Sequence, residues 1–223
     1  MTIDQRTAPR RDTPGRRAGF ASLLALLAGV LLGTLDFVWI KFVPGPLGGL
    51  GNSMAVWAVA AFLLSFRARW TLPVSVLAAV VLLVTAVPSY YLAAALIQHD
   101  DWANLFDANA LMWAAFGVVA GLVFGAGGAC ARGRGRIPES FRDAALALPG
   151  AVLFAEAGLQ AARIGDPDYS AGGQGAAVAV LVILGLGITR WLAPTWRRTG
   201  LVLIFALPLT AAGFALLSAT GFR

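Results

Sequence analysis

Seven long apolar stretches, most of them without a charged residue, dominate this 223-residue sequence. A helix needs about 20 apolar residues to cross the ~30 Å hydrocarbon core of a bilayer. The α-helix is the structure that we expect for each stretch, because backbone polar groups in lipid must find hydrogen-bond partners within the segment. The sequence therefore predicts an all-α integral membrane protein with a bundle of seven transmembrane helices. The expected spans are 18–40, 52–66, 71–97, 108–131, 141–162, 171–192 and 200–217.

Composition supports the same class and excludes most soluble ones. Hydrophobic residues make up 59% of the chain and charged residues 13%, against about 45–50% and roughly 25% in soluble proteins. The polar, arginine-rich stretch 1–17 predicts a disordered cytoplasmic tail. Residues 18–223 then form a single transmembrane domain, which we expect in the cell membrane.

The 17 basic residues are concentrated beside the ends of the apolar stretches. Such clusters mark cytoplasmic loops, whereas a nucleic-acid site needs its basic residues on one folded face. With the N-terminus inside, 14 bases lie on the cytoplasmic side and only Lys41, Arg163 and Arg223 lie outside. Seven crossings place the C-terminus outside, and the bilayer rather than nucleic acid is the expected partner.

Two acidic residues inside the apolar stretches are the strongest candidates for a functional site. Asp36 lies near the end of the first span and Glu156 near the end of the fifth, so both belong to the outer half of the membrane. An ionisable group at that depth is costly unless it is paired or hydrated. Gln160 and Arg163 share a helix face with Glu156. This face is either the polar wall of a cavity or an internal ladder that pairs Arg163 with Glu156.

The connection 41–53 adds a second feature to this outer region. It contains two prolines and four glycines and yet stays apolar, which predicts a loop that dips into the outer leaflet or a tight external connector. Asn52 or Ser53 then caps the short helix that follows. Aromatic side chains beside the carboxyls suit an amine or a flat heterocycle as ligand, and no metal or cofactor is expected. The aromatic candidates are Trp39, Trp57, Tyr90 and Tyr91.

Small side chains recur every four residues along two of the expected helices. The first helix carries Ala21, Ala25, Gly29 and Gly33, and the fourth carries Gly117, Gly121 and Gly125. Such ridges let helices approach closely. They serve either packing within the chain or docking of another membrane protein, and the first ridge is the candidate docking surface.

The stretch Leu-Asp-Phe-Val-Trp-Ile-Lys at 35–41, with Pro-Gly-Pro-Leu-Gly-Gly-Leu-Gly-Asn-Ser at 44–53, resembles a bacterial family of integral membrane proteins of unknown function. More remotely, the layout of 18–195 resembles the substrate-binding S-components of energy-coupling-factor transporters. That resemblance implies a six-helix core, an outward-facing pocket closed by 41–53, and a small-residue ridge that docks a coupling subunit. The seventh helix departs from that pattern, and no vitamin-specific motif is present.

Three functions stay open at this point. The first is a protein that binds or transports a small molecule through an outward-facing pocket near the two carboxyls. The second is a structural or regulatory membrane protein in which the acids only tie helices together. The third is an intramembrane enzyme that uses the carboxyls as an acid–base pair.

Overall fold

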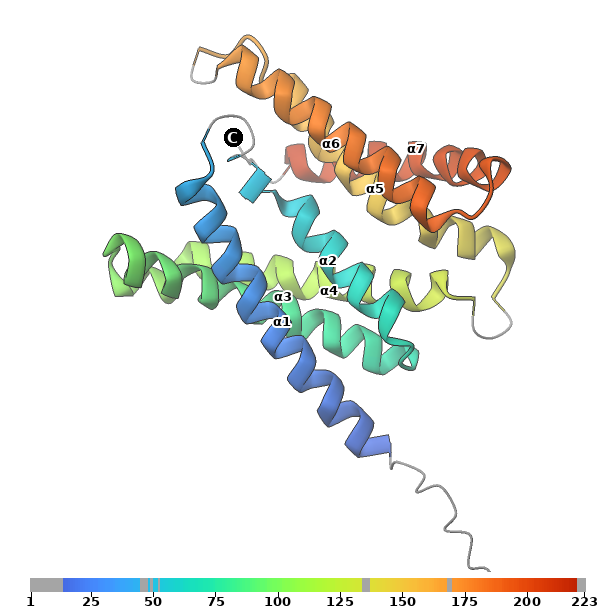
Figure 1. Cartoon of the computed structure of the whole chain (residues 1–223), viewed down its shortest axis with the longest axis horizontal. Coiled ribbons are helices and arrows are strands. Elements are labelled where there is room, and N and C mark those ends of the chain that lie inside the picture. The colour runs from blue at the N-terminus through green and yellow to red at the C-terminus, as the bar shows by residue number, and fades with distance from the viewer. Residues whose placement is uncertain are drawn as a thin grey trace, which may run out of the picture.

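The computed structural model describes residues 14–44, 48, 50–51, 53–133, 137–167 and 170–219, with the backbone alone for 14–17 (Figure 1). The described chain is all-α, with seven α-helices and a short 3-10 helix, η2, before the fourth of them. Their bounds are α1 (Pro14–Phe42), α2 (Met54–Ala68), α3 (Leu72–Gln98), η2 (Trp102–Leu105), α4 (Ala108–Ala131), α5 (Glu139–Ala162), α6 (Ala171–Leu192) and α7 (Trp196–Ala219).

Six of these helices are long and apolar enough to cross a membrane, so the chain is a multi-pass membrane protein. The prediction of seven helices is confirmed, and the bounds 108–131 and 171–192 match those of α4 and α6. α1 begins earlier than expected, so residues 14–17 of the predicted tail are helical. Pro14 is the first residue of that helix, a position where the missing N–H of proline costs nothing. Residues 1–13 of the tail lie outside the described residues.

The second predicted span differs from the other six. α2 has 15 residues and is therefore about 22 Å long at 1.5 Å per residue. That length is less than the ~30 Å of a bilayer core, and α2 is not one of the six candidate spans. It is nevertheless a central helix, because it packs against α3, α4 and α5. Figure 1 shows it between α1, α3 and α4 on one side and α5, α6 and α7 on the other.

α1 packs on α3 through its ridge of small residues, and the two helices run parallel. Ala21, Ala25, Gly29 and Gly33 are all buried. A methyl group added to Gly29 would collide with the carbonyl oxygen of Leu82, and one added to Gly33 with that of Ala86. The structure therefore places this ridge inside the chain, where α3 covers it.

α4 packs antiparallel to α3 through the second ridge. A side chain at Gly121 would meet the backbone of Val80, and one at Gly125 would meet Ala79. α1, α3 and α4 form one half of the molecule, and α5, α6 and α7 form the other. In this second half, α5 packs against both α6 and α7. The Thr189 hydroxyl of α6 lies against Gly150 of α5. Glycines thus set the close helix contacts in both halves.

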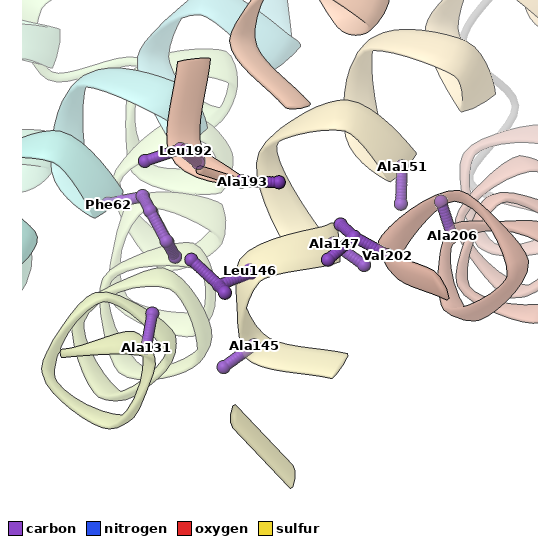
Figure 2. Close-up of a cluster of buried hydrophobic side chains, with 10 residues drawn as sticks. All are labelled: Phe62, Ala131, Ala145, Leu146, Ala147, Ala151, Leu192, Ala193, Val202 and Ala206. Atoms are coloured by element: carbon purple, nitrogen blue, oxygen red, sulfur yellow. The ribbon is translucent and has the colours of Figure 1, made fainter. Parts of the chain in front are cut away.

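A buried hydrophobic cluster joins the two halves (Figure 2). Phe62 of α2 is fully buried there, in one cluster with Leu146 of α5 and with Leu192 and Ala193 at the end of α6. Val202 extends the cluster to α7. The short helix therefore contributes its largest buried side chain to the junction.

One end of the molecule collects most of the described arginines, and we call it the arginine-rich end. The Arg132 Nη2 donates to the Trp70 carbonyl at 2.7 Å, which joins the end of α4 to the start of α3. The Arg198 guanidinium pairs with Asp143 at 2.8 Å, which joins the starts of α7 and α5. The arginines of this end are Arg67, Arg69, Arg132, Arg142, Arg190, Arg197 and Arg198. At the opposite end, the Lys41 Nζ donates to the Gln98 side chain at 3.0 Å.

Candidate functional site

Glu156 reaches from α5 to the first turn of α2. Its side chain is only 3% exposed. One carboxyl oxygen, Oε2, accepts a hydrogen bond from the Ser53 hydroxyl at 3.0 Å and another from the Ala55 backbone N–H at 2.7 Å. These contacts connect residues more than 100 positions apart. Glu156 is therefore fixed at the N-terminus of α2.

The beginning of α2 explains why a carboxyl belongs there. The first four N–H groups of a helix have no partner within the helix, and its N-terminus carries a partial positive charge. Ser53 is the N-cap residue, and its hydroxyl accepts from the Val56 N–H at 3.3 Å. Glu156 adds an acceptor for the N–H of Ala55. The prediction of a cap at 52 or 53 is confirmed for Ser53, while Asn52 lies outside the described residues.

Asp36 of α1 lies beside the same helix turn. Its carboxyl lies close to the side chain of Trp57 on α2, and it is within electrostatic range of Glu156. The Asp36 side chain is half-buried. The structure thus brings three predicted site residues, Asp36, Trp57 and Glu156, together around the start of α2.

Both acids lie the same number of residues before the end of their helix. Asp36 is six residues before the end of α1, and Glu156 is six residues before the end of α5. At 1.5 Å per residue, each lies about 9 Å inside its helix end. The backbone just before α2 lies inside the protein, with Gly51 and Ser53 both buried, so the N-terminus of α2 is recessed.

Two tyrosines extend the site along α3. The Tyr90 ring meets Phe37 of α1 edge to face at 5.6 Å between centroids, and it meets Tyr91 in the same way at 5.5 Å. Tyr90 is also within electrostatic range of Asp36. The predicted pair of phenols therefore lies on the α1 side of the site, with Tyr90 nearer to the carboxyl.

The connection between α1 and α2 folds back on the end of α1. A side chain at Gly51 would collide with Ile40 and would also press on Trp39 and the carbonyl oxygen of Asp36. Leu50 packs against a cluster formed by α2, α5 and α6. A larger side chain at position 51 would force these groups to shift, so Gly51 allows the described backbone before α2 to lie close to the end of α1.

Two predicted residues lie farther from the acids. Gln160 accepts a hydrogen bond from the Arg163 guanidinium at 3.3 Å. Of the predicted ladder, the contact between Arg163 and Gln160 is therefore present. The hydrogen bonds of Glu156 go to α2 instead. Trp39 is 44% exposed and touches the site through Gly51. The sequence predicts Ser53 as a cap, but it carries no signal for the bond between Ser53 and Glu156.

The site contains more acidic than basic residues. Arg163 is the base whose charge acts on Glu156, and Lys41 is bonded to Gln98. Among the described residues, no group of three or more His, Cys, Asp or Glu side chains could hold a metal ion. The two carboxyls and the phenol can accept hydrogen bonds from a donor-rich cation, and the indole and phenol rings can contact its charge and its apolar part through their faces.

Comparison with known proteins gives a family and no established function. A profile described as a family of unknown function (DUF6518) matches residues 12–221. The chain belongs to this family. Searches of curated proteins and of solved structures each found no match. DUF6518 membership agrees with the expected membrane family of unknown function, and these comparisons show no link to the S-components of energy-coupling-factor transporters.

Proposed function

We propose that this DUF6518 protein binds a positively charged small molecule, an amine or a cationic flat heterocycle, in the outer half of the membrane and takes part in its transport. The observation that carries the proposal is the meeting of Asp36 and Glu156 at the recessed N-terminus of α2. Short helices that begin within the membrane form substrate sites in many transporters. Here the helix start is paired with acids from two other helices.

The charge balance supports a cationic ligand. The N-terminus of α2 supplies about half a positive charge, and it faces Glu156 directly. Asp36 has the neutral Trp57 side chain as its neighbour on α2. A second carboxylate at this depth costs several kcal/mol if it stays uncompensated. A bound cation offsets that cost, and Trp57 and Tyr90 add aromatic faces.

The proposed orientation places the arginine-rich end in the cytoplasm and the carboxyl site near the outside. The distribution of bases supports it: the arginines whose side chains the structure describes lie at that end, except for Arg163. Cytoplasmic loops carry such an excess of arginine and lysine. The N-terminus is then inside, and ligand enters from the outside. The same argument favours the cell membrane as the location and a C-terminus outside.

If a coupling subunit docks on this protein, we propose that it uses a surface other than the small-residue ridge of α1. The S-component resemblance assigns docking to Ala21, Ala25, Gly29 and Gly33, but α3 covers these residues. The opposite face of α1 carries large exposed apolar side chains, including Leu27 and Leu31. A substrate-capture role would use such an outer face and not the small-residue ridge.

A structural role for the acids is the second candidate, and one observation favours it. Glu156 already has two hydrogen-bond donors from α2, as expected for a side chain that only joins helices. The two roles differ in what they require of the charge. A structural acceptor is replaced well by an amide oxygen, whereas a cation site needs the carboxylate.

The experiment is a thermal-shift screen of the purified protein with primary amines, quaternary ammonium compounds and cationic flat heterocycles. We expect at least one class to raise the Tm of the wild type. Asp36→Asn and Glu156→Gln should each abolish that shift while leaving the Tm without ligand nearly unchanged. Asp101→Asn, an exposed cap at the same end, is the matched control and should keep the shift. Equal shifts in all variants would refute the proposal and favour the structural role.

A further inference from the structure

Two pairs of stacked arginine and tryptophan side chains lie at the arginine-rich end, one between α2 and α6 and one between the end of α6 and the start of α7. The Arg67 guanidinium of α2 lies over the ring of Trp191 on α6, with 5.3 Å from Cζ to the ring centroid. The Arg190 guanidinium lies over Trp196, the first residue of α7, at 4.6 Å. We call these four residues the Arg–Trp cluster.

The Arg–Trp cluster leaves hydrogen-bonding capacity unused. Stacking engages the flat face of a guanidinium and leaves its N–H edges available for a planar two-oxygen acceptor. The exposed Arg67 donates no hydrogen bond to any described residue, and Arg190 donates one, to the Ala193 carbonyl at 2.9 Å. The described carboxylate at this junction, Asp143, is paired with Arg198.

Positive charge without a matching acid is therefore concentrated at this junction. Within the part of the chain that the structure describes, no carboxylate lies within ion-pair distance of Arg67, Arg190 or Arg197. Arg197 follows Trp196 directly and is exposed. A phosphate group is the anion that matches free guanidinium edges in both geometry and charge.

We propose that the Arg–Trp cluster binds the phosphate headgroup of an anionic phospholipid. Trp191 is 56% exposed and Trp196 is 77% exposed, as expected for indoles at the level of lipid headgroups. Basic sites between membrane helices at the cytoplasmic side bind such headgroups.

The surface next to the cluster favours a lipid over a soluble phosphate. Ile183, Gly187 and Trp191 follow one another at four-residue intervals and therefore share one face of α6. Ile183 is exposed, and the space over Gly187 is open, because a methyl group added there would have no atom within 4 Å. This apolar strip runs from the guanidinium groups toward the middle of the span. An acyl chain fits along this strip, whereas a free phosphate has no apolar part that could contact it.

The test is native mass spectrometry of the purified full chain with dioleoyl phosphatidylglycerol or dioleoyl phosphatidylcholine. We expect the wild type to retain phosphatidylglycerol at least about tenfold better than phosphatidylcholine. Arg67→Gln should weaken that preference and Arg67→Gln/Arg190→Gln should remove it. Lys41→Gln is the matched control, because it removes one exposed positive charge at the opposite end.

Several outcomes would overturn the proposal. Equal retention of the two lipids by the wild type is one, and an equal loss in Arg67→Gln and Lys41→Gln is another. Full competition by glycerol 3-phosphate at the same concentration would show a soluble phosphate site in place of a lipid site. If the double variant does not fold, Arg67→Lys/Arg190→Lys replaces it. This variant keeps the charge, loses the planar fork, and should show a reduced preference for phosphatidylglycerol.

Discussion

The Glu156 carboxyl of α5 accepts the backbone N–H of Ala55 in α2 at 2.7 Å, so one helix completes the first turn of another. Glu156→Leu removes this acceptor and leaves the Ala55 N–H and the Ser53 hydroxyl without it. We expect a loss of about 1–3 kcal/mol in the free energy of unfolding, the cost of an unsatisfied buried polar group. Thermal unfolding in detergent measures the effect as a lower Tm.

Glu156→Gln is the matched control for that prediction. Its amide oxygen can accept the same two hydrogen bonds, so its Tm should stay close to that of the wild type. A Tm as low as that of Glu156→Leu would show that the negative charge itself stabilises the start of α2.

The proximity of the Asp36 carboxyl to the Trp57 side chain predicts an energetic coupling between α1 and α2. A double-mutant cycle with Asp36→Leu and Trp57→Phe isolates it. Side-chain hydrogen bonds in membrane proteins average about 0.6 kcal/mol and reach about 1.7, so we expect a coupling in that range. Strictly additive effects of the two substitutions on unfolding would argue against a direct bond.

The contact between α1 and α3 depends on the lack of a side chain at Gly33. Gly33→Ala places a methyl group against the Ala86 carbonyl oxygen, which cannot move without displacing the α3 backbone. We expect a loss of about 1–3 kcal/mol, typical of overpacking, seen as a lower Tm.

Gly187→Ala tests whether this effect comes from the contact. Gly187 is also within a helix, but no atom lies within 4 Å of the added methyl group. Because alanine is the better helix former, its Tm should be unchanged or slightly higher. A similar loss in both variants would place the cause in the helix backbone.

The orientation of the chain can be measured by cysteine labelling in intact cells. In a Cys130→Ser background, Asp101→Cys lies in the proposed outer connection and should react with a membrane-impermeant maleimide. Thr195→Cys lies at the arginine-rich end and should react only after the cells are permeabilised. The reverse pattern would invert the topology and place the carboxyl site on the cytoplasmic side.

Much of the architecture could be predicted from the sequence because each membrane helix corresponds to a local pattern, a long apolar stretch between polar or glycine-rich breaks. Apolar length predicts α4 and α6 to the residue, and polar or glycine-rich breaks separate the other helices. The sequence places the start of α1 too late, because the arginines at 16 and 17 end the apolar stretch. The helix continues through them to Pro14, since a helix outside the hydrocarbon core tolerates charge.

The partners of the helices could not be predicted in the same way. The ridge at Gly29 and Gly33 indicates a close contact but not whether its partner is α3 or another protein. In the same way, the depth of Glu156 marks it as unusual, while its bonds to Ser53 and Ala55 depend on the packing of α5 against α2. A lone sequence holds no direct record of such contacts between distant segments.

Uptake into proteoliposomes tests the central claim most directly, with the cation that gives the largest thermal shift as the labelled substrate. We predict uptake by the wild type and Asp101→Asn, and a loss of at least about tenfold in both Asp36→Asn and Glu156→Gln at an unchanged Tm. Wild-type uptake rates in either amide variant would contradict a cation site built on these two carboxyls.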